Sequence, residues 1–389
     1  MYTAFTANGA RCKIEERYSM KRLNHIDGLK GWCAISVCAL HFMLMFAMNG
    51  YVSWRCLPEA AADPFGYYFK WFPYSVLSNN SFPLYIFFAL ISFIVSYTFL
   101  KNRDESKLKQ KIVMRYFRLL PLVFIGCLAA YLLLAFKLCP LQEFYEITGN
   151  TWAYARLEET YTVLDMLKIG LFTSFFTGTQ LVSPFWCLHY IFLGSMLSYV
   201  LMLIYTGVKN KAVLFGLAFV FFCFVDQNYL SFIVGLAAGC IADRECRVGK
   251  AKGALLVFSG CILGLFPPVL LPSFINVLLL YALGAGLVIV GIHSSFSQNR
   301  ILCNRFIEFL GKESLALIVW QMLVLQSLNV FMYNALHRAG MGSPLNVAIN
   351  LAVNVLVSLL LTLVSSRTIT PLTNLTCERV NALLQRKAE

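Results

Sequence analysis

The chain has 389 residues, of which 59% are hydrophobic and only 13% are charged. Soluble domains usually carry about 25% charged residues, so this composition excludes an ordinary soluble enzyme and predicts a protein that is solvated by lipid. A net charge of +13 can indicate nucleic-acid binding, but here the basic residues cluster between apolar runs, and we expect no nucleic-acid partner.

Ten apolar runs follow one another along the chain. A helix needs about 20 such residues to cross roughly 30 Å of hydrocarbon, and only a helix satisfies its own backbone there. The runs therefore predict an all-α membrane protein, a polytopic bundle of about ten transmembrane helices. The predicted spans lie near 31–48, 83–100, 119–136, 185–205, 212–226, 229–242, 253–271, 274–292, 313–333 and 346–366.

The positions of Lys and Arg predict the orientation, because these residues favour the cytoplasmic side of a membrane. If both termini are cytoplasmic and the segment 164–180 does not cross, 26 of the 32 Lys and Arg lie inside. Asp165 and Lys168 interrupt that segment, which favours a re-entrant or surface helix. We expect a cytoplasmic N-terminal segment over 1–30, one membrane domain over 31–366 and a cytoplasmic tail over 367–389.

The predicted outer segment 137–163 contains four Glu residues, several Tyr and Trp152. Two interpretations are open for it. It is a solvated loop, or it forms one wall of a substrate cleft on the outer side.

Two of the five histidines, His41 and His189, fall inside predicted spans. Ionisable side chains are costly in hydrocarbon, so each of them is a candidate functional residue. Lys30 stands eleven residues before His41, a helical rise of roughly 16 Å, so it lies near the inner surface with His41 at mid-membrane. A neutral imidazole at that depth can act as a general base, or it can serve only as a hydrogen-bonding link between helices.

Arg115 and Arg118 lie three residues apart, on one face of the helix that enters the third span. Such a pair can bind phosphate groups at the cytoplasmic surface, or it can anchor the helix by its positive charge alone. No spacing of Cys and His typical of a metal site occurs, and we expect no metal ion.

Two further polar groups lie in apolar surroundings. His189 follows Trp186 and precedes Tyr190 near the outer start of the fourth span, where it can face a cavity or bond to a neighbouring helix. Gln321 is an amide inside the ninth span and needs a partner there, which favours a role in helix packing.

Taken together, these segments resemble the integral-membrane acyltransferase-3 family, which includes the O-acetyltransferases of bacterial surface polysaccharides. Their order and spacing carry the resemblance through most of the chain. The matching pieces are Leu23–Lys30 with His41 after it, Phe87–Phe93, the stretch from Arg115 through Arg118 to Pro121, Trp186 with Gly194 and Ser195, Phe232–Gly239, and Leu310–Ser314.

The resemblance implies a bundle in which acyl-CoA, acetyl-CoA or another, enters from the cytoplasm. Its acyl group then passes to a hydroxyl of a carbohydrate or glycan-lipid on the far side of a bacterial cytoplasmic membrane. By position, His41 would be the catalytic base and Lys30 the basic residue of the same motif, close to the entry path of the donor. Arg115 and Arg118 would bind the phosphates of the donor.

Three positions depart from the family pattern. Ser92 replaces an expected Gly, Ile191 replaces an acidic residue that often follows the Trp motif, and Gln321 replaces a frequent His. Without that carboxylate, His189 would be a local substitute in stabilising an imidazolium. The residues alone leave two other functions open, a small-solute transporter and a non-catalytic membrane partner descended from the enzyme.

Overall fold

The structure, a computed structural model, describes residues 23–47, 62–63, 81–155, 160–179, 181–243, 249–266, 271 and 276–385. Throughout these ranges the regular elements are all helices, and no strand occurs. The prediction of an all-α protein is confirmed for this part of the chain.

Seven of the described helices are long and apolar enough to cross a membrane. Each overlaps one of the ten predicted spans. They are α2 (Asn24–Phe46), α6 (Phe82–Asn102), α7 (Glu105–Ala135), η3 with α12 (Ser183–Gly207), α16 (Val277–Ser295), α18 through η6 to α19 (Ser314–Arg338), and α20 (Ser343–Gln385).

The other three predicted spans correspond to shorter helices. These are α13 (Lys211–Val225), α14 (Leu230–Asp243) and α15 (Lys250–Gly264), with 15, 14 and 15 residues. Each falls short of the roughly 20 residues that a straight crossing needs. The structure therefore supports seven spans by length, and the count of ten remains a prediction.

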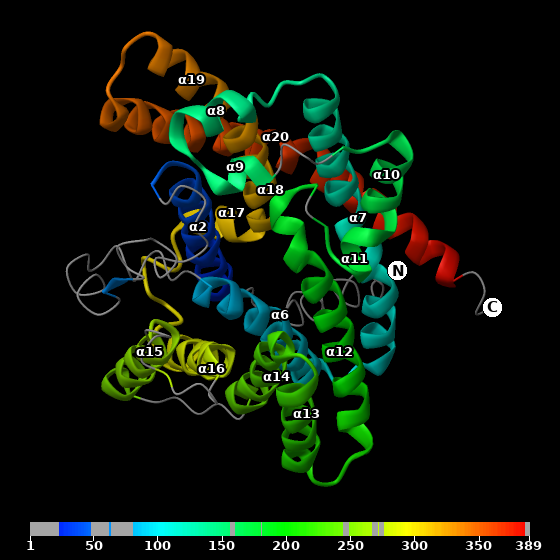
Figure 1. The fold of residues 1–389 in the computed structure, drawn as a ribbon. Coiled ribbons are helices and arrows are strands. Elements are labelled where there is room, and N and C mark those ends of the chain that lie inside the picture. The colour runs from blue at the N-terminus through cyan, green and yellow to red at the C-terminus, as the bar shows by residue number, and fades with distance from the viewer. Residues whose placement is uncertain are drawn as a thin grey trace, which may run out of the picture.

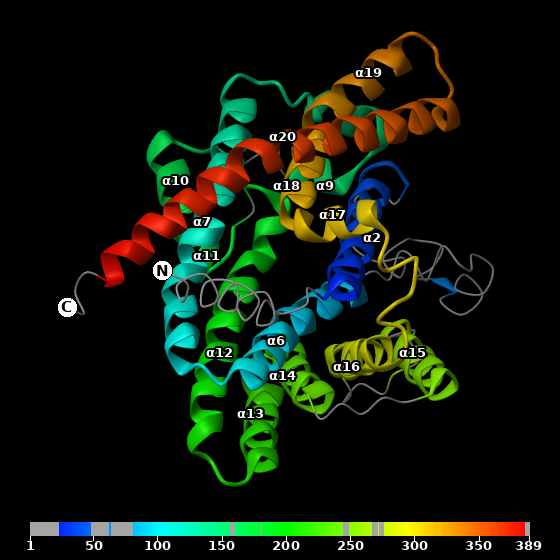
Figure 2. The ribbon, with the colours of Figure 1, turned by 180° about the vertical axis from the view of Figure 1, so that it is seen from behind.

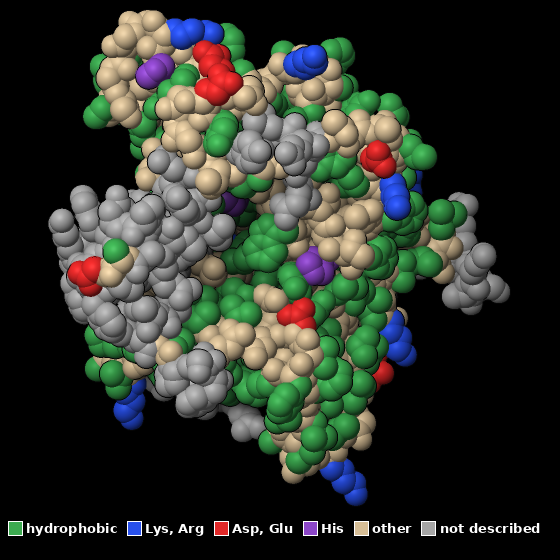
Figure 3. All heavy atoms as spheres, in the orientation of Figure 1, with side chains coloured by type: hydrophobic (Ala, Val, Ile, Leu, Met, Phe, Trp, Pro, Cys, Tyr) green, Lys and Arg blue, Asp and Glu red, His purple; other side chains and the backbone are tan. Residues whose placement is uncertain are grey.

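Large apolar side chains face outward over much of the molecule, as Figure 3 shows for one face. α13 buries none of its residues, and its Leu217 and Phe224 are 67% and 87% exposed. Monomeric soluble proteins rarely expose apolar area on this scale, whereas lipid tails cover it at no cost. The chain is an integral membrane protein.

The segment predicted not to cross forms one short helical run. It consists of α10 (Val163–Lys168), the π-helix η2 (Ile169–Thr173) and α11 (Ser174–Phe176), which pack against α7 and α12. These 14 residues rise about 21 Å, too little to cross the hydrocarbon.

Small residues allow α6 and α14 to pack closely. A Cβ atom on Gly235 would lie 2.1 Å from the carbonyl oxygen of Ala89, and one on Gly239 would lie 2.0 Å from Ser96 Oγ. Ser92 Oγ, also next to Gly235, bonds back to Ala89 O at 3.1 Å. Ser92 therefore keeps the interface close even though it stands where the family pattern has Gly.

The last helix crosses the bundle obliquely, packing on α7 and α18 (Figures 1 and 2). α20 has 43 residues and passes Arg367, the predicted start of the tail, without a break. Its length of about 64 Å is roughly twice the hydrocarbon thickness. At one end of the molecule, α19 (Val330–Arg338) and the short helices α8 (Leu141–Thr148) and α9 (Thr151–Ala155) lie together over α2 (Figure 1).

Candidate functional site

His41 lies on α2, on the side that faces α18 (Ser314–Val324), and is only 8% exposed. Its Nδ1 atom is 3.3 Å from the side-chain oxygen of Gln321. An amide oxygen can only accept, so Nδ1 donates this bond. Among the described residues, no partner meets Nε2. The imidazole is thus held at one nitrogen and available at the other.

Gln321 is itself held on its other side. Its Nε2 atom donates to the carbonyl oxygen of Cys38 at 3.3 Å and to Asn354 Oδ1 at 3.4 Å. The position where the family often has His is therefore in direct contact with His41.

An aromatic ring covers His41 from the predicted outer side. Trp152, on α9, lies with its ring centroid 6.3 Å from that of His41 at an interplanar angle of 26°. Asn150 ties this region to the end of α2, because its amide donates to the carbonyl oxygens of Leu44 and Met45 at 3.1 and 2.9 Å.

The predicted outer segment is consequently a folded cap. Leu141 and Phe144 of α8 and Ala153 of α9 are buried, and they pack with Phe42 and Met45 of α2. In its described part this packing contradicts the interpretation as a solvated loop, and the interpretation as one wall of a substrate cleft stays a prediction.

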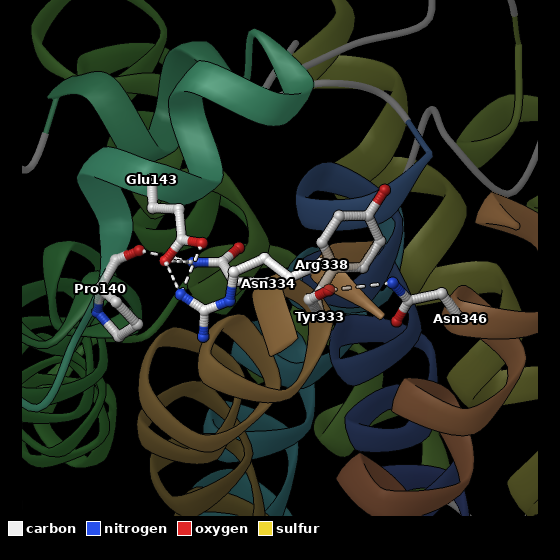
Figure 4. Close-up of polar contacts among 6 residues, drawn as sticks. All are labelled: Pro140, Glu143, Tyr333, Asn334, Arg338 and Asn346. Carbon is white, nitrogen blue, oxygen red and sulfur yellow. Dashed lines mark hydrogen bonds and ion pairs between the residues drawn. The ribbon is translucent and has the colours of Figure 1, made fainter. Parts of the chain in front are cut away.

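A polar cluster attaches the cap to α19, as Figure 4 shows. Arg338 forms an ion pair with Glu143 at 3.0 Å. Asn334 donates to Glu143 at 3.3 Å and to the carbonyl oxygen of Pro140 at 3.1 Å. The cap is therefore joined to both α2 and α19.

The opening motif and the loop motif near Gly311 lie against each other. A Cβ on Gly311 would be 1.7 Å from the carbonyl oxygen of Asp27, so α17 (Arg305–Lys312) and α2 touch along their backbones. Lys30 forms an ion pair with Asp27 at 3.6 Å. Lys30 and His41 thus share α2 but lie about three turns apart.

Arg115 and Arg118 differ in their surroundings. Arg115 is half-buried and donates through Nε to Ser195 Oγ at 3.0 Å, which joins two of the matching motifs. Arg118 is exposed. Among the described residues, neither amino group of the Arg115 guanidinium has a hydrogen-bond partner.

His189 belongs to a different cluster. Its ring centroid lies 3.8 Å from that of Tyr190. Asn228, just before α14, donates to Tyr190 OH at 3.1 Å and to Asp226 at 2.8 Å, and it accepts a bond from Tyr85. The structure thus holds His41 and His189 with separate sets of partners, so a supporting role of His189 beside His41 stays a prediction.

Four buried amides carry no role in the sequence prediction: Asn329, Asn346, Asn350 and Asn354. They are at most 3% exposed. Three of them recur every four residues in the last apolar run, a spacing that places amides on one helix face and could have indicated a buried polar stripe. Trp152 belongs to the segment 137–163, for which the sequence leaves both a solvated loop and one wall of a substrate cleft open.

The comparisons with known proteins agree with the resemblance in the sequence. The family described as acyltransferase domain, acyltransferase-3, matches residues 23–363. No curated protein and no solved structure matches the chain. The matched range covers nearly the whole chain and includes His41, Arg115 and Gln321. The chain therefore belongs to the acyltransferase-3 family and is a membrane acyltransferase.

Proposed function

We propose that the protein transfers an acyl group, acetyl by preference, from cytoplasmic acyl-CoA to a hydroxyl of a carbohydrate or glycan-lipid across the membrane. The observation that carries this proposal is the setting of His41. Its ring is buried, its Nδ1 is bound to Gln321, and no described residue bonds to Nε2. A base fixed in this way can accept a proton from a hydroxyl that approaches Nε2.

In this reaction His41 first receives one proton and later gives it up. Nε2 of His41 takes the acceptor hydroxyl proton as the oxygen attacks the thioester carbonyl. The tetrahedral intermediate then expels the CoA thiolate, and the imidazolium donates its proton to that thiolate. The ester C–O bond replaces the C–S bond, and the products are the acylated acceptor and free CoA.

Arg115 is the best placed of the described residues for holding the donor. Its Nε–Ser195 bond fixes the guanidinium, and its two amino groups are left for phosphate oxygens. Arg118, one turn away and exposed, adds a second charge, and Lys30 lies on the same predicted inner side. All three would face the cytoplasmic CoA pool.

The cap supports an acceptor on the opposite side. Trp152 lies above His41, and aromatic faces pack well against sugar rings, which are apolar on one side. We therefore place the acceptor between the cap and the outer end of α2. By the resemblance of the chain, the home membrane would be a bacterial cytoplasmic membrane.

The test uses the full chain in lipid nanodiscs with acetyl-CoA labelled in its acetyl group. We expect acetyl-CoA turnover, measured as free thiol, and label in a carbohydrate acceptor. His41→Ala should lower the rate about 100-fold or more, since a positioned base contributes ~10²–10⁴. His337→Ala, an exposed His on α19, is the matched control and should leave the rate unchanged.

Absence of turnover by the wild-type protein, or equal rates for His41→Ala and wild type, would contradict the proposal. Solute flux into proteoliposomes without any acyl transfer would instead favour a transporter.

A further inference from the structure

A line of buried amide side chains begins at His41 and ends at α19. Its members come from α18, η6 (Leu325–Asn329) and α20, and each is at most 3% exposed. In order from His41 they are Gln321, Asn354, Asn329, Asn350 and Asn346.

Each amide donates to the side-chain oxygen of the next. Gln321 donates to Asn354 at 3.4 Å, and Asn354 donates to Asn329 at 2.8 Å. Asn329 donates to Asn350 at 3.0 Å, and Asn350 donates to Asn346 at 2.8 Å. The side-chain bonds of the line therefore all have one direction, because in each of them the amide nearer His41 along the line donates to the next one.

Backbone carbonyls determine that direction, because a carbonyl oxygen can only accept. The last amide, Asn346, donates to the carbonyl oxygen of Tyr333 at 2.9 Å, as Figure 4 shows. Asn329 and Asn350 each donate to a further backbone carbonyl, of Asn350 and Asn346, at 2.8 and 3.0 Å. Reversing any of these three amides would place two acceptor oxygens against each other inside the protein.

The same logic applies at Gln321. One hydrogen of its NH₂ group points to the carbonyl of Cys38 and the other to Asn354. With both hydrogens used, only the oxygen can face His41, so the ring nitrogen that it meets must carry a hydrogen.

We infer that this amide line holds neutral His41 in the Nδ1–H tautomer, and that Gln321 is the positioning residue that makes Nε2 the basic nitrogen. The inference deepens the proposed function, since it names the atom that receives the acceptor proton. Amides that served only to join helices would not require one direction, and they would leave the tautomer of His41 undetermined.

Nitrogen NMR reads the tautomer directly, without any substrate. Full-length protein with ¹⁵N-labelled histidine is reconstituted in bilayers at a pH where the ring is neutral. The His41 signals are assigned by their loss in His41→Gln. We expect a protonated, pyrrole-type Nδ1 and a bare, pyridine-type Nε2. A His41 that carries its hydrogen mainly on Nε2 would overturn the inference.

Variants separate positioning from folding. Gln321→Leu removes the acceptor, so the Nε2–H form should appear and kcat should fall about 10- to 100-fold, a part of what a positioned base contributes. Gln321→Glu keeps an acceptor at the same place and should retain the Nδ1–H form. An unchanged tautomer in Gln321→Leu would also overturn the inference.

Asn334→Leu is the matched control. Asn334 is a buried amide, 1% exposed, that bonds to Glu143 and Pro140 and stands outside the line. Its loss should leave the His41 signals unchanged. Because the tautomer is measured without acyl-CoA, a failed transfer assay would count against the proposed function and leave this assignment standing.

Discussion

A histidine buried among apolar helices needs a partner for at least one ring nitrogen, since an unsatisfied polar atom there costs free energy. Gln321 supplies that partner for His41, and so the departure at this position changes the site itself. The departure at Ile191 is different in kind. Ile191 is only 6% exposed and belongs to the main apolar core, where it packs as any large aliphatic side chain would.

Gln321→Glu should shift the pH dependence of kcat. A carboxylate beside Nδ1 stabilises the protonated ring. Since the base must be neutral to act, the activity of the variant should fall at a higher pH than that of the wild type when the solution is acidified. We expect the acid limb of the pH–rate profile to move up by about one to two units. The profile of the Asn334→Leu control should keep its acid limb in place. A shift to lower pH would contradict the hydrogen-bond direction described for His41.

Arg115→Ala should mainly weaken donor binding. The loss of charge-assisted hydrogen bonds to phosphate is expected to raise KM for acyl-CoA about 10-fold, with a smaller change in kcat. Arg115→Lys should recover only part of the loss, because an ammonium lacks the planar fork of the guanidinium. Arg338→Ala, on the cap side, is the control. Steady-state kinetics with varied acetyl-CoA measures these KM values. An unchanged KM in Arg115→Ala would contradict a role of Arg115 in donor binding.

At the scale of elements, close helix contacts are built on small residues placed one turn apart. Gly235 and Gly239 of α14 lie against the backbone and serines of α6, and α16 approaches α15 where Gly284 meets Gly260. Since lipid gives no hydrophobic force between helices, such contacts supply much of the association free energy.

Gly235→Ala should therefore destabilise the bundle. The added Cβ would lie 2.1 Å from a backbone oxygen of α6, which cannot move without shifting the helix. We expect the free energy of unfolding to fall by about 1–3 kcal/mol, measured as a lower midpoint of thermal unfolding in detergent. Gly216→Ala on α13 is the matched control, because no atom beyond its own stretch of helix backbone lies within 4 Å of its added Cβ. Equal midpoints for the two variants would refute this account of the α6–α14 contact.

At the scale of the whole molecule, the cap and the basic residues of the candidate donor site belong to opposite predicted sides of the membrane. The segment rich in Glu folds into the cap on the side predicted to be outer, and Lys30, Arg115 and Arg118 belong to the side predicted to be inner. The orientation itself is a prediction from the Lys and Arg distribution.

Cysteine labelling in intact cells tests it. Glu146→Cys, exposed on the cap, should react with a membrane-impermeant maleimide. Gln298→Cys, exposed between α16 and α17, should react only after the cells are permeabilised. The labelling of each variant is measured relative to that of the unsubstituted chain. The reverse pattern would mean that the bundle has the opposite orientation, with Arg115 on the outer side.

Much of the architecture was predictable because hydropathy and charge are local sums along the chain. The apolar runs located all seven long helices that the structure describes, and α10, η2 and α11 in the interrupted run 164–180 are together too short for a straight crossing. The predicted spans 212–226 and 229–242 agree with α13 and α14 to within one residue at each end. α15 differs, because it ends at Gly264, whereas the apolar run predicts a span that continues to residue 271.

The sequence by itself determined the solvent, the helical class, the family and the candidate residues His41, Lys30, Arg115 and Arg118. Only the tertiary structure decided what surrounds His41. Its partner Gln321 lies 280 residues away, the amide line passes between two further helices, and Trp152 reaches it from a segment that resembled a loop. The physical reason is that a hydrogen bond depends on the distance and direction between two side chains, and helix packing alone brings such distant residues together.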